Sequence, residues 1–144
     1  MNQDLKPLEE EIGSALKIPH VVFDEVSFHR TGFKNEKSEA KLSIGTQVNK
    51  DGEGQYRVTI HLEVQKDKEY NVTVQLTGFC QISESHPHKD VLLRENAVAI
   101  LFAYARSELT LITSQPEVDP LVLPVVNINA MLQQGKKNVE MPEE

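Results

Sequence analysis

The sequence predicts an α+β fold in which a four-stranded antiparallel sheet is covered on one face by two helices. Between about residues 20 and 83, apolar and polar residues alternate with the period of two that is typical of half-buried strands. Near residue 97 the spacing changes to the i, i+3, i+4 pattern of a helix, and Pro116, Pro120 and Pro124 then exclude a second long helix. A sheet with one apolar face needs a cover, and the helical region supplies it.

The expected strands lie at 20–30, 41–48, 56–65 and 70–83. Glycine, Asn and Asp between residues 49 and 54 predict a turn, and the charged stretch Lys66–Glu69 predicts a tight one. Short turns join antiparallel neighbours, so these strands form an antiparallel sheet. Gly78 indicates a bulge in the last strand.

The helical region carries apolar residues on two sides. Asp90 is expected to cap a short helix over residues 91–93, and Asn96 a longer one over 97–113. The wide apolar stripe consists of Val98, Leu101, Phe102, Ala105, Leu109 and Ile112. The other side carries Ile100, Ala103, Tyr104 and Leu111. One sheet covers one side only, so the second side predicts self-association into a dimer or tetramer.

The remaining segments divide the chain into three parts. Leu8, Ile12 and Leu16 share a helical face, which predicts an N-terminal arm or short helix over residues 1–18. The α+β domain spans residues 19–133 and includes an extended apolar run over 121–126 and a short closing helix capped by Asn127. The polar residues 134–144 are expected to form a flexible tail.

Length and charge exclude several classes of protein. The 144 residues fit one domain, and the net charge of −7 disfavours binding to nucleic acid or to an anionic membrane surface. No apolar stretch approaches the length of a membrane span. The single cysteine, Cys80, cannot form an intrachain disulfide, and the N-terminus does not resemble a signal peptide. We therefore expect a cytoplasmic protein.

The candidate catalytic and metal-binding residues do not form a recognisable site. His86-Pro87-His88 offers two imidazoles where a zinc site needs three or four ligands. Cys80 lies within a predicted strand and is expected to be a core residue. The serines lack a nucleophile elbow, and the acids of Asp24-Glu25 point to opposite faces of a strand. We expect no catalytic residue, no metal and no cofactor.

Several segments resemble the SecB family. They are Leu101-Phe102-Ala103-Tyr104-Ala105-Arg106, the stretch from Leu121 to Leu132, Val26-Ser27-Phe28, and Ser38-Glu39-Ala40-Lys41-Leu42. The resemblance spans roughly residues 20–132. It is closer still to uncharacterised SecB-like proteins of Gram-positive bacteria. It implies a crossover loop between the first two strands, two helices on one face, and dimers that pair into tetramers with the long helices between the sheets.

Two departures from the family bear on function. The loop after the first strand is short and polar here, and Phe33 is its only aromatic residue. Positions that match the acidic and leucine contacts of the family with the export motor keep Glu25 but carry His29, Asn71 and Thr73. Without those acids the surface loses the potential that would steer a basic partner, so docking to the motor is doubtful.

The predicted function is to hold non-native or partner polypeptides in an apolar groove, without catalysis. The residues expected to form the groove are Phe28, Phe33, Val125, Ile128, Met131 and Leu132. One alternative is an interaction protein dedicated to a single partner and unrelated to export. Another is a small metal- or ligand-binding enzyme that uses His29, His61 or the pair His86 and His88.

Overall fold

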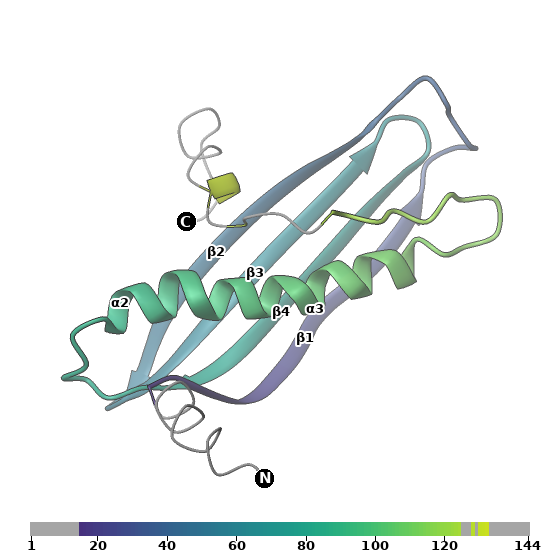
Figure 1. The fold of residues 1–144 in the computed structure, drawn as a ribbon. Helices are drawn as coiled ribbons and strands as arrows, with labels where there is room; N and C mark the ends of the chain where they lie inside the picture. The colour runs from purple at the N-terminus through teal and green to yellow at the C-terminus, as the bar shows by residue number, and fades with distance from the viewer. Residues whose placement is uncertain (1–14, 125–127, 129, 133–144) are drawn as a thin grey trace, which may run out of the picture.

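The computed structural model describes residues 15–124, 128 and 130–132, and its central feature is one antiparallel sheet (Figure 1). The strands are β1 (Lys17–Arg30), β2 (Ala40–Gly52), β3 (Gln55–Lys66) and β4 (Tyr70–Gln81). They are followed by α2 (Lys89–Val91), the π-helical turn η1 (Leu92–Asn96) and α3 (Ala97–Ile112). The predicted α+β class and the antiparallel sheet are confirmed.

The strand order β1-β4-β3-β2 places the first two strands at opposite edges of the sheet. Residues 31–39 cross from one edge to the other, and this segment is called the crossover loop below. The other neighbours, β2 with β3 and β3 with β4, follow each other in the chain and pair antiparallel. The crossover that the family resemblance implies is therefore present.

Two strands run further than their sequence pattern predicts. β1 begins at Lys17 rather than at His20, and β2 continues through the expected turn to Gly52. Pairing of Asn49 with Arg57 and of Lys50 with Tyr56 keeps β2 extended, so only residues 53 and 54 are left for the turn. The partner strand, rather than the local sequence, decides where β2 ends.

The bulge expected at Gly78 is wrong. β4 pairs with β3 without interruption past this residue, whereas the irregularities lie in β1, between Lys17 and His20 and between Phe23 and Glu25. Gly78 serves helix packing instead. A Cβ built there would lie 2.9 Å from Leu101 Cδ2 of α3 and 3.3 Å from Ile18 Cγ2. Glycine thus lets the helix approach β4 closely.

The two predicted helices are present as α2 and α3, but η1 joins them in one run and neither has a side-chain cap. Asn96 and Val91 both have helical backbone angles and make no side-chain capping bond, so the cap predicted at Asn96 is wrong. The first helical turn follows His88, and Asp90 lies within that turn instead of capping it. A π-helical turn joins the two segments because it absorbs an extra residue without breaking the backbone hydrogen bonds.

α3 and the segment after it cover one face of the sheet. The buried residues of α3 are Ala97, Val98, Leu101, Phe102, Ala105 and Leu109, and they meet the fully buried side of β3 and β4. After α3 the chain turns back and runs across the same face (Figure 1). Thr110 Oγ1 donates to Leu121 O and Leu121 N donates to Thr113 Oγ1, both at 2.8 Å. Residues 121–124 form neither helix nor strand, and residues 128 and 130–132 are helical, whereas residues 125–126 and the predicted cap Asn127 lie outside the described residues.

Candidate functional site

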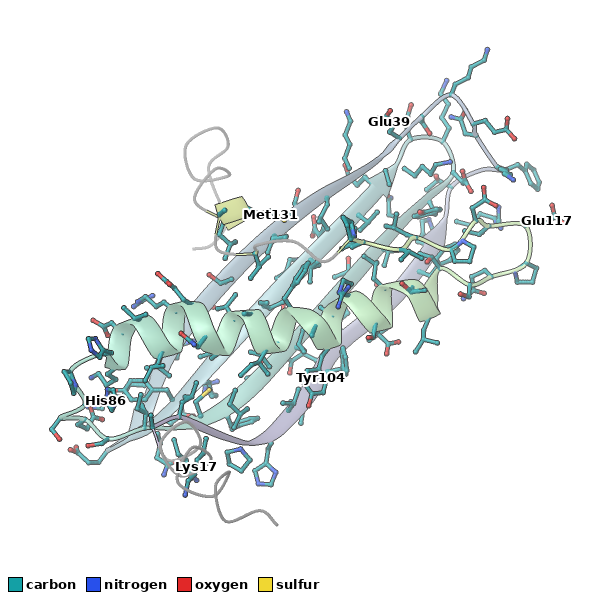
Figure 2. The ribbon with its side chains drawn as sticks, viewed as in Figure 1. Lys17, Glu39, His86, Tyr104, Glu117 and Met131 are labelled. Atoms are coloured by element: carbon teal, nitrogen blue, oxygen red, sulfur yellow. The ribbon has the colours of Figure 1, made fainter. Side chains whose placement is uncertain are left out.

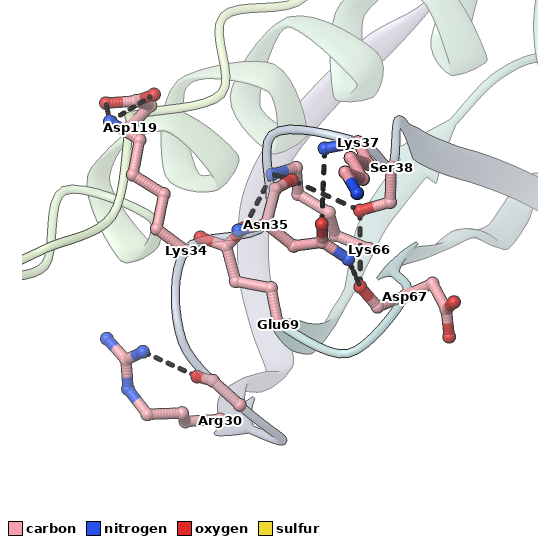
Figure 3. A network of polar contacts seen from close by, with 10 residues as sticks. Arg30, Lys34, Asn35, Lys37, Ser38, Lys66, Asp67, Glu69 and Asp119 are labelled. Atoms are coloured by element: carbon pink, nitrogen blue, oxygen red, sulfur yellow. Dashed lines mark hydrogen bonds and ion pairs between the residues drawn. The ribbon is translucent and has the colours of Figure 1, made fainter.

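The crossover loop is held firmly against the β3–β4 turn (Figure 3). The backbone carbonyl of Glu69 accepts hydrogen bonds from the N–H groups of Thr31 at 2.9 Å and Gly32 at 3.2 Å. The Glu69 carboxylate accepts one from the backbone N–H of Asn35 at 2.9 Å, and Lys66 Nζ donates to Asn35 O at 2.8 Å. The loop is therefore a fixed platform rather than a loose connection.

Glu69 is the centre of this network and is 1% exposed. Burial by itself raises the pKa of the Glu69 carboxyl, but the hydrogen bonds from Lys66 and from the Asn35 backbone outweigh burial and hold its pKa below the ordinary value. The Lys66 side chain, whose ammonium pairs with this carboxylate, is only 19% exposed. The ion pair lies within the β3–β4 hairpin, and the loop is anchored because each member of the pair also bonds the backbone of Asn35.

The anchored loop presents one large aromatic side chain to solvent. Phe33 is 83% exposed, the highest value among the large apolar side chains that the structure describes. The Arg30 guanidinium lies 5.9 Å from its ring centroid and also donates to Gly32 O at 2.7 Å. Val122, in the segment that runs back across the sheet after α3, is 70% exposed.

The other predicted groove residues lie deeper. Phe28 packs against Tyr70 with ring centroids 5.3 Å apart and is half-buried, and Ile128 is buried in the core. Met131 and Leu132 are partly buried against the same core, and Figure 2 shows Met131 toward the β2 edge of the sheet. Val125 lies outside the described residues. The structure does not join these side chains to Phe33 in one groove, so the groove stays a prediction.

The outward side of α3 exposes the second apolar stripe. Ile100, Ala103, Tyr104 and Leu111 are all exposed, and they follow one another along the helix at nearly helical repeats. Figure 2 shows Tyr104 on the side of α3 that faces β1. There, Phe23 of the edge strand joins Ala103 and Tyr104 around a shallow hollow of about 370 Å³.

The face of the sheet opposite α3 is polar, and it carries the positions compared with the motor contacts. β1 contributes Glu25 and His29, while Asn71 and Thr73 come from the adjacent β4. Burial opposes protonation of His61 on this face, but its hydrogen bonds to Glu63 and Gln75 raise the pKa of the imidazole. This face therefore mixes charged and uncharged polar groups, and His61 bonds both Glu63 and Gln75.

The surroundings of the candidate catalytic and metal-binding residues indicate structural roles. Burial raises the pKa of the Cys80 thiol to about 11, which leaves it an unreactive core residue. The ring centroids of His86 and His88 are 6.0 Å apart, and His86 Nδ1 accepts the backbone N–H of His88. Among the described residues, no three His, Cys, Asp or Glu side chains gather as a metal site would require. In that same part of the chain, no helix combines the length and apolar character needed to cross a membrane.

The sequence pattern did not predict the positions of two residues, Phe23 and Glu69. Phe23 reaches the α3 side only because Asp24 is the extra residue of a bulge, which shifts the alternation of β1 and has no sequence signal of its own. The sequence places Glu69 in a charged turn, where acidic side chains are normally exposed, but the structure buries it. Its burial follows from the crossover loop lying over it.

The fold and its surfaces define a single-sheet α+β protein with a fixed crossover loop and exposed apolar side chains beside its helix. The chain belongs to the SecB family of chaperones, since the family model described as preprotein translocase subunit SecB matches residues 13–139. An uncharacterised protein of Methanocaldococcus jannaschii is 27% identical over 128 residues, which are 82% of this chain and 83% of that protein.

A solved structure gives the same fold. It is a SecB-like chaperone of Mycobacterium tuberculosis in complex with a peptide from an antitoxin, and it superposes with a TM-score of 0.65 at 12% identity. The superposition covers 85% of this chain and 96% of that chain. At this identity the comparison establishes the fold alone, and it agrees with the sheet and helices described above.

Proposed function

We propose that the protein holds non-native or partner polypeptides in the cytoplasm by burying their apolar side chains, without catalysis. The observation that carries the proposal is the exposure of Phe33 on a rigid loop, within a fold of the SecB family. Burial of apolar surface contributes about 25 cal/mol per Å², so a few such contacts hold an unfolded segment reversibly. The predicted groove residues Phe28, Val125, Ile128, Met131 and Leu132 remain part of this proposal.

A light-scattering assay tests the holding function. A reduced, unfolded client protein is diluted from denaturant with the chain at stoichiometric ratio, and the rate of aggregation is followed. We expect slowed aggregation without any need for a nucleotide, because capture rests on burial alone. Unchanged aggregation at a several-fold excess of the chain would contradict the proposal.

We also propose that the outward side of α3 joins copies of the chain in a dimer or tetramer. The exposed stripe lies beside Phe23, which lines the hollow with Ala103 and Tyr104 as well as the polar Ser107 and Glu108, and exposed apolar patches on soluble proteins often mark association surfaces. Tyr104 lies at its centre, beside the hollow. Aromatic residues at the centre of an interface usually contribute most to its stability.

Replacing Tyr104 by aspartate is expected to weaken self-association at least tenfold, because the carboxylate would have to be desolvated in the interface. Sedimentation equilibrium over a range of protein concentrations measures the change. Thr73→Asp is the matched control, since it adds the same charge on the opposite face of the sheet. If both variants self-associate as strongly as the wild-type chain, α3 is not part of the interface.

The alternative of a single dedicated partner is favoured by one finding, the antitoxin peptide bound by the Mycobacterium tuberculosis chaperone. The polar crossover loop, with Phe33 as its only aromatic residue, also offers less adaptable surface than a promiscuous binder needs. A pull-down from the native cell separates the two functions. One abundant partner supports dedication, whereas a broad set of clients supports general holding.

A further inference from the structure

A hollow beside Phe33 combines an exposed aromatic ring with three lysines. It lies between the crossover loop and the β3–β4 turn and has a volume of about 420 Å³. Phe33 lines it together with Lys34, Lys37 and Lys68, and the other lining residues are Asn35, Ser38 and Asp67. Three cations and one acid thus surround the most exposed large apolar side chain of the described residues.

Hydrogen bonds fix the backbone around this hollow. Asn35 Nδ2 donates to Asp67 O at 3.0 Å, and Asn35 Oδ1 accepts the backbone N–H of Lys37 at 3.2 Å (Figure 3). At Gly32 the loop passes so close to the turn that a Cβ would collide with Lys68 O. Binding of a partner therefore requires little ordering of the main chain, and only the lysine side chains lose freedom.

The positive charge of the hollow is only partly neutralised by the described residues. Lys34 pairs with Asp119 at 3.2 Å in open solvent. Within the part of the chain that the structure describes, neither Lys37 Nζ nor Lys68 Nζ takes part in an ion pair. The two glutamates of the crossover loop do not line the hollow. Two ammonium groups are therefore left to pair with a partner, on a chain whose net charge is −7.

The backbone of Lys68 is strained. Its φ of 62° lies in the left-handed region, which glycine and asparagine adopt at lower cost than a residue with a long side chain. A lysine at this position strains the turn and places a cationic side chain at the hollow. The position thus carries a charge where an uncharged glycine would relax the turn.

We propose that this hollow selects acidic polypeptide segments. An apolar side chain of the segment packs against Phe33, and the carboxylates beside it pair with Lys37 and Lys68. The inference rests on the proposed function and names the class of segment that is held. The lysine stems add apolar surface around the ring while their ammonium groups stay in solvent, so one site offers both contacts. The opposite charges also steer the segment to the loop.

A nucleic acid fits the hollow less well, although it also combines rings with negative charge. Its phosphates repeat along the whole strand, so a bound strand would extend beyond the hollow over a chain of net charge −7. A peptide can confine its carboxylates to the positions that face the two lysines. The charge distribution therefore favours a short acidic segment, and an oligonucleotide serves as one arm of the test.

The test uses three peptides and three double variants of the full chain. Each peptide has the same apolar centre with one phenylalanine, flanked by two glutamates, two glutamines or two lysines. K37Q/K68Q removes both ammonium groups and K37E/K68E reverses their charge, at positions that are exposed in the wild-type chain. K17Q/R94Q is the matched control, because both residues are exposed and lie toward the other end of the sheet.

Fluorescence anisotropy of labelled peptides measures the affinities. We expect the wild-type chain to bind the glutamate peptide about fivefold more tightly than the glutamine peptide, the strength of two exposed ion pairs. K37Q/K68Q should abolish this preference, K37E/K68E should transfer it to the lysine peptide, and K17Q/R94Q should retain it. Because exposed pairs are screened by salt, raising the ionic strength from roughly 0.05 M to roughly 0.5 M should remove most of the preference.

Three results would overturn the inference. They are the absence of a preference in the wild-type chain, an equal loss of preference in K37Q/K68Q and K17Q/R94Q, and an oligonucleotide of the same charge that binds as tightly as the glutamate peptide. Phe33→Ser tests the apolar contact separately, and it should weaken the binding of all three peptides. Unchanged affinities in this variant would place the segment elsewhere and also contradict the inference.

The outcomes separate this inference from the proposed function. If the chain slows aggregation of the unfolded client but binds the three peptides equally or not at all, the holding function stands and the selection of acidic segments fails. If no peptide binds and aggregation is unchanged, both fail.

Discussion

Replacing Glu69 by alanine is expected to lower the free energy of unfolding by about 3 kcal/mol, the usual cost of removing one member of a buried ion pair. The carboxylate is almost fully buried, so its loss removes the ionic partner of Lys66 and leaves the backbone N–H of Asn35 without its acceptor. Urea unfolding at a fixed protein concentration measures the change, because self-association would contribute to the apparent stability.

The same carboxylate makes stability depend on pH with a defined sign. The pKa of Glu69 is lowered in the folded chain, so its stabilisation is complete above the unfolded pKa of about 4.3 and is lost as pH falls through the folded value. The difference in unfolding free energy between the wild-type chain and Glu69→Gln should therefore be constant near neutral pH and shrink at acid pH.

The exposed pair Lys34–Asp119 provides the control, because it ties the same loop at 3.2 Å in open solvent. Asp119→Ala should leave the free energy of unfolding almost unchanged, since exposed ion pairs contribute little. Equal effects of Asp119→Ala and Glu69→Ala would mean that burial of Glu69 does not anchor the crossover loop.

Gly78→Ala is expected to lower the free energy of unfolding by about 2 kcal/mol through overpacking. The added methyl would meet Leu101 at 2.9 and 3.2 Å, and Leu101 is fully buried between α3 and β4. To avoid this contact, the Leu101 side chain would have to shift within the packed core. Shortening the obstructing residue by Leu101→Val in the same chain should recover part of the loss, which a double-mutant cycle measures.

Gly45 is the matched control for this prediction, since it also lies within a strand. A Cβ at Gly45 meets no atom within 4 Å, so Gly45→Ala should leave stability unchanged or raise it by up to about 1 kcal/mol. Equal stabilities of Gly78→Ala and Gly45→Ala would contradict the close contact between α3 and β4.

Much of the fold could be predicted because periodicity reports which side of an element is buried. The alternation in β3 and β4 identified their buried face, and the apolar residues on both sides of α3 separated its core side from its exposed stripe. The ends of elements were predicted less well. The length of β2 and the continuous helix across Asn96 depend on partners that are distant in sequence.

The candidate surfaces, too, were predicted from the sequence only in part. The sequence by itself determined that Phe33 lies in a polar loop and that Ile100, Tyr104 and Leu111 are apolar residues beyond the needs of one core. Only the tertiary structure decided that Glu69 is buried, that Phe23 lies beside Tyr104, and that β1 and β2 are the two outer strands of the sheet. The physical reason is that a local pattern records the face a residue presents, whereas its neighbours across strands are set by chain crossing and long-range hydrogen bonds.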